Sequence, residues 1–193
     1  FKGAPKFPQF YVFDTVHYFY LKNKNEKFLK PVENLLSKIS SRGIYDQIEG
    51  GIARYTVDEK WIIPHFEKML YDNILYVNLL NNFLCNINSN YLKGKLIQTI
   101  NFINSEFKTE NNLLGSAYDA DSEGIEGKYY VWEDKELKNV LKKDYDFFAK
   151  FYDISENGNW EGKNILIEKN IKPSKENSEK LKKIKNKLLN IRE

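Results

Sequence analysis

The sequence predicts a mainly α protein built from consecutive helical hairpins, arranged as a solenoid or a toroid. Apolar residues recur at spacings of three and four in several long stretches. The loops between these stretches carry only short segments of alternating pattern, and no long strand pattern occurs. With 193 residues and 41% hydrophobic content, the chain can form a genuine core. Helices that stack pairwise in this order bury each other's apolar faces.

The first predicted hairpin follows a proline-rich entry. The segment FYVFDTVHYFYLK is expected to form a short helix, and FLKPVENLLSKISS a second, amphipathic helix. Pro31 fits the first turn of the second helix if that helix begins at Lys30. A loop then runs from Arg42 to Trp61, with three glycines and no sustained helical period. Because the loop is rich in aromatic residues, we expect it to be structured and functional.

The second predicted hairpin begins at Pro64. The pattern predicts that this proline opens the longest helix, HFEKMLYDNILYVNLLNNFLCNI, whose partner runs from Tyr91 to Lys108. Cys85, the only cysteine, falls within the apolar run of the first helix, and we expect it to be buried. A single cysteine allows no intrachain disulfide, which indicates a reducing compartment and predicts a cytoplasmic protein.

The remaining third of the chain mixes short strands and helices. Between Leu113 and Trp132 an alternating pattern predicts two short strands joined by a polar, glycine-containing loop. A third helical region starts with an acidic turn at Glu133 and continues through YDFFAKFYDI, and GNWEGKNILIE predicts another strand-like segment. The basic stretch from Lys169 to Arg192 has leucines and isoleucines at helical spacing, which predicts a surface helix with a solvated basic face.

Charge and composition exclude several classes of partner. Thirty basic and 27 acidic residues leave a formal charge of +3, without the interleaved basic and aromatic residues of a nucleic-acid site. No stretch approaches the ~20 apolar residues of a membrane span. We therefore expect neither nucleic acid nor a membrane as partner. The two histidines argue against a multi-histidine metal site, and we expect no metal and no cofactor.

The string PHFEKMLYDN holds the first candidate set, His65, Glu67 and Asp72. If Pro64 opens a helix, His65 and Asp72 lie two turns apart on one face, so an imidazole and a carboxylate share one surface. Loop ends at helix entrances are places where functional groups gather. The alternative is that the two side chains form a structural pair that ties the loop to the helix.

The string AYDADSEG holds the second set, Asp119, Asp121 and Glu123. Alternate residues of an extended segment face the same side, so three carboxylates can converge there. Such a group suits general acid and base catalysis, a divalent cation, or the hydroxyls of a sugar. The spacing does not match an EF-hand loop. The alternative is a solvated acidic hairpin tip.

The long loop holds the third set. Aromatic rings interspersed with amides, carboxylates and a guanidinium are typical of carbohydrate sites, because rings cover the apolar faces of a sugar and polar groups bind its hydroxyls. A tightly packed structural loop has a similar composition. The residues concerned are Tyr45, Asp46, Gln47, Arg54, Tyr55 and Trp61.

Four strings together resemble a known family. They are APKFP at 4–8, GIYDQIEGG at 43–51, RYTVDEKWIIPHFEKMLYDN at 54–73 and AYDADSEGIEGKYYVW at 117–132. They resemble the thioredoxin domain-containing proteins related to spermatogenesis-associated protein 20. The resemblance implies an N-terminal thioredoxin-like domain followed by an (α/α)6 toroid similar to six-hairpin glycosidases and sugar epimerases. Residues 1–193 then form about the first half of that toroid, and the thioredoxin-like domain and the second half lie outside this chain.

The resemblance also implies a function in carbohydrate processing, as a glycoside hydrolase or a sugar isomerase. In this hypothesis Asp119 or Asp121 acts as general acid or base, assisted by His65 and Glu67. Substrate is bound by the residues of the long loop together with Asp72 and Glu123. The alternative is a non-catalytic module that binds a glycan or peptide, or serves as a scaffold, beside the thioredoxin-like domain. One departure favours that alternative, because family members typically have histidine where this chain has Ala53.

Both ends of the chain predict further protein beyond them. The start, FKGAPKFPQF, has no initiating methionine, and the end, LLNIRE, stops within a helical pattern without a capping glycine or proline. Half a toroid is expected to leave inner helices with an uncovered apolar face. We therefore expect the isolated chain to be poorly stable or to self-associate.

Overall fold

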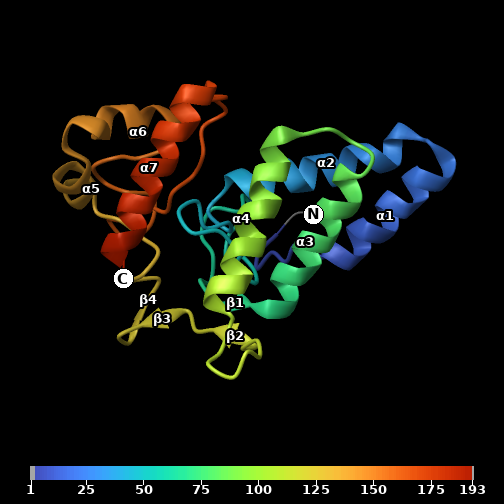
Figure 1. Cartoon of the computed structure of the whole chain (residues 1–193), viewed down its shortest axis with the longest axis horizontal. Coiled ribbons are helices and arrows are strands. Elements are labelled where there is room, and N and C mark those ends of the chain that lie inside the picture. The colour runs from blue at the N-terminus through green and yellow to red at the C-terminus, as the bar shows by residue number, and fades with distance from the viewer. Residues whose placement is uncertain (1–2, 193) are drawn as a thin grey trace.

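The computed structural model describes residues 3–192 and is mainly α, as predicted. Helices α1 (Phe10–Asn23) and α2 (Glu26–Ser41) form the first hairpin, and α3 (Leu70–Leu84) and α4 (Asn90–Glu106) the second. Helices α5 (Asp134–Leu141), α6 (Tyr145–Phe151) and α7 (Lys175–Arg192) follow. In Figure 1 the two hairpins occupy one side of the molecule and α5, α6 and α7 the other. The long loop 42–67 lies between them and carries the candidate site.

Two large apolar clusters stabilise the two sides. The first joins α1, α2 and α3 through residues such as Leu36, Ile39 and Leu80, all fully buried. The second joins α5, α6 and α7 through residues such as Leu137 and Leu188. Apolar residues at spacings of three and four on each helix supply these contacts, which is why the helical period predicted the helices correctly.

Cys85 is exposed, so the expectation that it is buried was wrong. Helix α3 ends at Leu84, and Cys85 caps its C-terminus. The buried stripe of α3 runs through Tyr76, Leu80 and Phe83. Cys85 lies two positions beyond Phe83, away from this stripe.

Two helix starts differ from the sequence prediction. Helix α2 begins at Glu26 because the Asn25 side chain accepts a hydrogen bond from the backbone N–H of Lys27, so Pro31 lies in the second turn. Helix α3 begins at Leu70 rather than after Pro64. With 15 residues α3 is also shorter than α7, which has 18.

The segment between Pro64 and α3 is extended. Phe66 has a φ of 57°, in the left-handed region, which interrupts a right-handed helix. Strand β1 (Lys68–Met69) then pairs antiparallel with β2 (Ala117–Tyr118), nearly fifty residues away. His65 and Asp72 therefore do not lie on one helical face, and that prediction was wrong.

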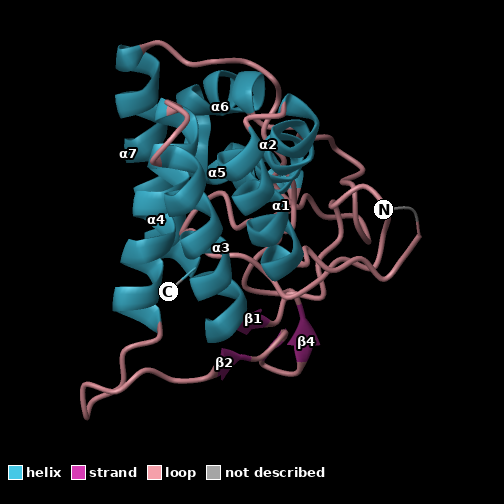
Figure 2. Ribbon diagram, turned by 90° about the vertical axis from the view of Figure 1, so that its right-hand side faces the viewer, coloured by secondary structure: helices cyan, strands magenta, loops and turns pink. Residues whose placement is uncertain are grey.

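The predicted polar hairpin is present. Strand β3 (Asp121–Ser122) pairs antiparallel with β4 (Ile125–Glu126), and Glu123 and Gly124 form the turn with positive φ. Figure 2 shows the strands below the helices. The third helical region is broken after α5, where Lys142 takes a positive φ and a short 3-10 helix (Lys142–Asp144) leads into α6.

The last helix is less solvated than expected. It begins at Lys175, and its buried stripe of Leu181, Ile184 and Leu188 is as predicted. Two of its basic side chains nevertheless face inward, since Lys185 is 18% and Arg192 only 4% exposed. The prediction of a solvated basic face was therefore wrong for these two residues.

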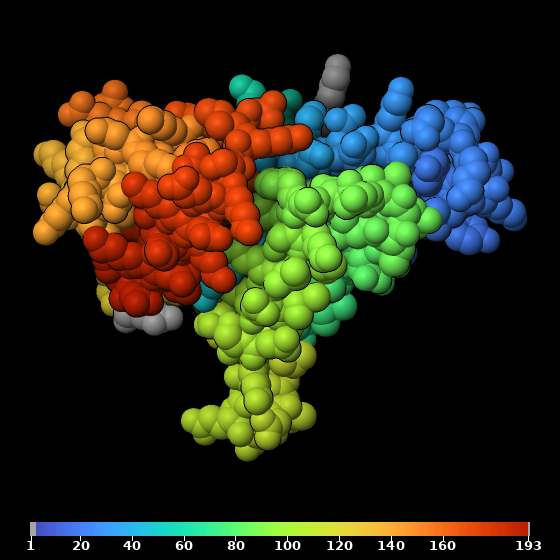
Figure 3. Space-filling view, turned by 45° about the horizontal axis from the view of Figure 1, so that its top comes forward, coloured from blue at the N-terminus to red at the C-terminus, as the bar shows by residue number. Residues whose placement is uncertain are grey.

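The surface carries apolar residues and one projecting segment. Large apolar side chains are exposed on α1 and α4, among them Tyr11, Tyr18, Ile97 and Ile100. Figure 3 shows the exposed stretch after α4, around residues 108–116, projecting from the body. No helix within residues 3–192 combines the length and apolar character that crossing a membrane requires.

Candidate functional site

The loop 42–52 turns back on itself and points polar side chains into the interior. Tyr45 and Ile52 form an antiparallel bridge, and the Asp46 backbone N–H donates to the carbonyl of Gly51 at 3.0 Å. Gly51 has a φ of 80°, and a Cβ at this position would lie 2.4 Å from the Phe102 ring. Glycine is therefore required by both conformation and space. The tight loop thus places the side chains of Tyr45, Asp46 and Gln47 in the buried interior, which we call the buried centre.

Asp46 is held between two cations. Its Oδ2 lies 3.0 Å from Lys68 Nζ and 2.8 Å from Arg192 Nη1, and its Oδ1 accepts the backbone N–H of Ile48 at 3.0 Å. Burial acts to raise the pKa of Asp46, but Arg192 and Lys68 outweigh it and hold the pKa well below its usual range. The carboxylate is therefore ionised and fully paired.

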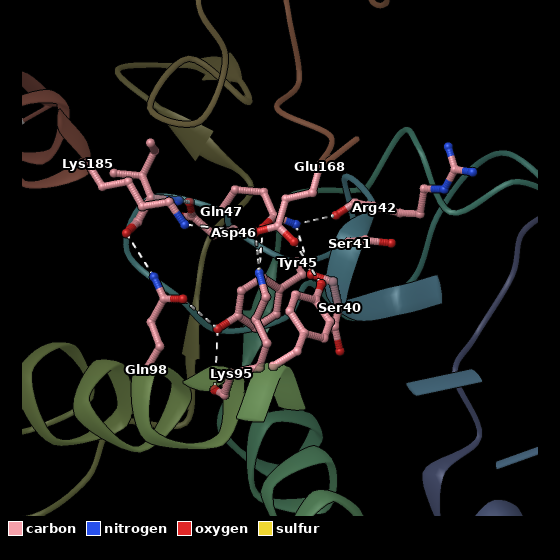
Figure 4. Close-up of polar contacts among 12 residues, drawn as sticks. Ser40, Ser41, Arg42, Tyr45, Asp46, Gln47, Lys95, Gln98, Glu168 and Lys185 are labelled. Atoms are coloured by element: carbon pink, nitrogen blue, oxygen red, sulfur yellow. Dashed lines mark hydrogen bonds and ion pairs between the residues drawn. The ribbon is translucent and has the colours of Figure 1, made fainter. Parts of the chain in front are cut away.

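Beside it lies a second buried polar cluster, which spans α4, the segment before α7, and α7. Lys95 Nζ donates to Gln47 Oε1 at 2.6 Å and to Glu168 Oε1 at 2.9 Å, while Lys185 Nζ lies 3.9 Å from the same Glu168 oxygen (Figure 4). Tyr91 also donates to Glu168 at 2.7 Å. Burial opposes the charge of Glu168, yet the two lysines lower its pKa. Burial lowers the pKa of Lys185 to about 8.

A cavity of about 20 Å³ lies beside Asp46, and its walls include Ala53, Phe66 and Arg192. This is room for about one water molecule. Ala53 presents only a methyl group to the cavity. No proton-transfer group is therefore contributed from this position.

A third polar group, which we name the Arg54 cluster, consists of Arg54, Glu67, Tyr71 and Asp72. A bulge brings Arg54 and Glu67 together. Thr56 pairs with Pro64, but the Arg54 backbone N–H donates to the Glu67 carbonyl, so the segment 64–67 has one residue more than the segment 54–56 opposite it. The extra residue is accommodated at Phe66, whose φ is in the left-handed region. Arg54 Nη1 and Glu67 Oε2 meet at 3.2 Å, with their side chains 40% and 27% exposed.

Asp72 is the buried member of the Arg54 cluster. It lies in the first turn of α3 and is 8% exposed, and its Oδ2 has no hydrogen-bond partner within the part of the chain that the structure describes. Burial raises the pKa of Asp72 to about 6, although Tyr71 and Arg54 act to lower it. The Nε of Arg54 is likewise buried without a partner among the described residues. A donor and an acceptor of the Arg54 cluster thus both lack a partner among the described residues.

His65 belongs to different surroundings. Its ring stacks on Tyr55 at 4.9 Å, and Tyr55 stacks on Phe7 at 4.8 Å. Its Nδ1 lies 3.1 Å from Glu126 Oε1, and Glu126 pairs with Asp121 across the β3–β4 hairpin. The hairpin is thereby connected to the segment that follows Pro64, through Glu126 rather than through the aspartates.

The acidic hairpin is exposed. Asp119, Asp121 and Glu123 all face solvent, and Glu123 contacts Lys128. Of the three residues only Asp121 lies in a strand, since Asp119 precedes β3 and Glu123 occupies the turn. The expected alternation of three carboxylates along one extended segment was therefore wrong.

Trp61 is buried at 4% exposure, with Lys6 Nζ 4.7 Å from its ring centre. Across residues 3–192, no three His, Cys, Asp or Glu side chains are grouped to hold a metal ion.

The candidate residues are thus not gathered in one site. Tyr45, Asp46 and Gln47 lie in the buried centre, and Arg54, Glu67 and Asp72 meet in the Arg54 cluster. His65 stacks on Tyr55 and contacts the exposed acidic hairpin through Glu126, and Trp61 lies in the first apolar cluster. The cationic partners were missed from the sequence: Lys68, Lys95, Lys185 and Arg192. A signal existed for some of them, because Lys95 sits on the buried stripe of α4, and Lys185 and Arg192 continue the spacing of Leu181 and Leu188 on α7.

Comparisons with known proteins agree with the motifs. No family model matches the chain. It is 31% identical over 179 residues to an uncharacterized protein of Caenorhabditis elegans, covering 82% of the chain and 24% of that protein. It is 27% identical over 201 residues to spermatogenesis-associated protein 20 of Mus musculus, covering 86% of the chain and 25% of the mouse protein. The human protein of that name is 27% identical over 183 residues, covering 82% of the chain and 23% of its own length.

The chain therefore spans about a quarter of the length of the curated relatives it matches. The expected similarity to proteins named spermatogenesis-associated protein 20 is confirmed.

Proposed function

We propose that this chain is part of a carbohydrate-processing-like (α/α)6 toroid and that its Arg54 cluster binds a polyhydroxylated ligand. The observation that carries the proposal is the buried, unpartnered Oδ2 of Asp72 beside Arg54, whose Nε also has no partner among the described residues. A hydroxyl group both donates and accepts hydrogen bonds, so the hydroxyl groups of a ligand can supply the partners that these two atoms lack. The exposed parts of Arg54 and Glu67 give the ligand access.

The same cluster supports proton transfer. A carboxyl group with a pKa of about 6 exchanges its proton readily near neutral pH. Glu67, held by Arg54, is a second carboxylate in a different environment, and such pairs divide acid and base roles between them. We assign the general acid or base of a glycoside hydrolase or sugar isomerase to Asp72 rather than to the exposed Asp119 or Asp121. The setting we propose is a cytoplasmic protein with a thioredoxin-like domain elsewhere in its chain.

A second function, binding of a glycan or peptide without turnover, is favoured by Ala53. The methyl group of this residue lines the central cavity and cannot carry a proton. In that case Asp72 and Arg54 bind ligand, and no bond is broken.

The test is a panel of mono- and oligosaccharides and aryl glycosides, assayed for binding and turnover with the chain and its variants. We expect Asp72→Asn to abolish turnover, and Arg54→Lys to weaken binding about tenfold, because lysine lacks the planar Nε–H. Asp119→Asn and Asp121→Asn are the matched controls and should change neither.

The outcomes separate the alternatives. Binding without turnover in the unmodified chain supports the non-catalytic function. Loss of binding in the hairpin variants, with Asp72→Asn unaffected, would relocate the site to the hairpin and refute the assignment.

A further inference from the structure

The guanidinium group of Arg192 lies in a buried seat formed by residues distant in sequence. Its Nη1 donates to Asp46 Oδ2 at 2.8 Å, and its Nη2 donates to the Tyr130 carbonyl at 3.2 Å. The rings of Tyr129, Tyr130 and Trp132 have their centres 5.1, 5.6 and 5.7 Å from its central carbon. We call these residues, Asp46, Tyr129, Tyr130 and Trp132, the Arg192 seat.

Charge alone does not explain the seat. Lys68 lies 3.0 Å from Asp46 Oδ2 and 3.9 Å from Glu49, so Asp46 has an ammonium partner, shared with Glu49, besides Arg192. A guanidinium adds what an ammonium lacks, namely a plane with donors along its edge and a weakly hydrated face that packs on aromatic rings. The seat offers a carboxylate and a carbonyl to the edge and three rings around the group. Its side chain is accordingly only 4% exposed.

The seat joins separate parts of the fold. Asp46 belongs to the loop 42–52, the three aromatic residues precede α5, and Arg192 ends α7. The cavity of about 20 Å³ beside the seat shows that packing there is not continuous. The last turn of α7 therefore combines the apolar contacts of Leu188 and Leu189 with a polar attachment through Arg192.

We propose that the Arg192 seat is a guanidinium-binding site, occupied by Arg192, that holds the C-terminal turn of α7 against the loop 42–52. The ligand class of the site is a guanidinium group, and an ammonium does not replace it. This proposal does not rest on ligand binding at the Arg54 cluster.

Chemical complementation tests the proposal. In Arg192→Ala the seat is empty, and hydrogen exchange of the backbone amides at 185–191 should accelerate at least about tenfold, with α3 and α4 unchanged. Methylguanidinium at millimolar concentration should restore the protection and raise the melting temperature in a saturable manner. Methylammonium, which has the same charge without the planar donors, should restore neither.

Three variants complete the design. Arg192→Lys keeps the charge and should exchange like Arg192→Ala, whereas Lys182→Ala, which removes an exposed charge from α7, should exchange like the unmodified chain. If Arg192→Ala does not fold, Tyr129→Leu in the presence of Arg192 should still accelerate exchange at 185–191 severalfold. Equal rescue by methylammonium, no rescue by methylguanidinium, or unchanged exchange in Arg192→Ala and Tyr129→Leu would each overturn the proposal.

Discussion

Asp72 is buried at a cost in folding free energy that an amide avoids. Its folded pKa of about 6 exceeds the ordinary value of 3.8, so the folded state binds more protons than the unfolded state between these pH values. The free energy of unfolding therefore falls as pH rises through this window. We predict that Asp72→Asn raises the free energy of unfolding at pH 7 by about 1–2 kcal/mol and changes it little at pH 4. Urea denaturation at the two pH values measures the difference.

Asp58 provides the matched comparison for Asp72. Its Oδ1 accepts hydrogen bonds from the backbone N–H groups of Ile62 and Ile63 at 2.9 and 2.6 Å, so the charged carboxylate is satisfied by the loop itself. Asp58→Asn should lower the free energy of unfolding at pH 7 by about 1–2 kcal/mol. A destabilised Asp72→Asn at pH 7 would mean that its carboxylate is satisfied, which contradicts the ligand-binding role.

At the scale of single residues, the sequence predicted which side chains are candidates for a site better than it predicted the partners that they contact. Residue types and motif positions selected Asp46, Arg54 and Asp72 from local strings. Their partners are set by tertiary structure, since Asp46 meets Arg192 across 146 positions of the chain. A lysine or arginine among apolar residues at helical spacing is the only local sign of such pairing, and it also fits a solvated face.

At the scale of elements, two glycines should respond in opposite directions to the same substitution. Gly51 has a φ of 80°, and a Cβ there would meet the Phe102 ring at 2.4 Å, so Gly51→Ala should destabilise by about 2–4 kcal/mol. Gly94 lies within α4, and nothing lies within 4 Å of its would-be Cβ. Gly94→Ala should therefore stabilise by about 0.5–1 kcal/mol.

Thermal unfolding of the two variants beside the unmodified chain measures both effects. A destabilised Gly94→Ala, or a neutral Gly51→Ala, would contradict the described loop and its packing on α4. Since Gly51 positions Asp46, its variant should also accelerate hydrogen exchange in the loop 42–52.

The helices were predictable where their own sequence decides their structure. Helices α1 and α4 follow the apolar period, and Asn25 is a recognisable cap for α2 in retrospect. The start of α3 was not predictable from Pro64. The residues before it are extended because Lys68 and Met69 pair with Tyr118 and Ala117, a contact that no local pattern encodes.

At the scale of the whole molecule, two inward-facing lysines share the Glu168 carboxylate and join the two sides of the molecule. Lys95 of α4 lies 2.9 Å from Glu168 and also satisfies Gln47, whereas Lys185 of α7 lies 3.9 Å away. The two lysines are therefore not equivalent. Removing Lys95 leaves the Gln47 oxygen without its donor and Glu168 without its nearest cation.

The two lysines should respond oppositely to methionine. The folded pKa of Lys185, about 8, is below the ordinary 10.5, so the folded state binds fewer protons in this window and stability rises with pH across it. At pH 7 the buried charge is a cost, and Lys185→Met should raise the free energy of unfolding by about 1–3 kcal/mol and remove the rise toward pH 10. Burial lowers the pKa of Lys95 as well, but Lys95→Met also leaves Gln47 without its donor and Glu168 without its nearest cation, and it should lower the free energy of unfolding by about 2–4 kcal/mol.

Denaturant unfolding at pH 7 and pH 10 measures both single variants and the double variant. The double variant leaves Glu168 with neither lysine, so its destabilisation should exceed the sum of the two single changes. Additive changes would mean that the lysines act independently of Glu168. Equal destabilisation by Lys185→Met and Lys95→Met would show that Lys185 stabilises α7 as much as Lys95 stabilises α4. The Arg192 seat would then no longer be the principal polar attachment of α7.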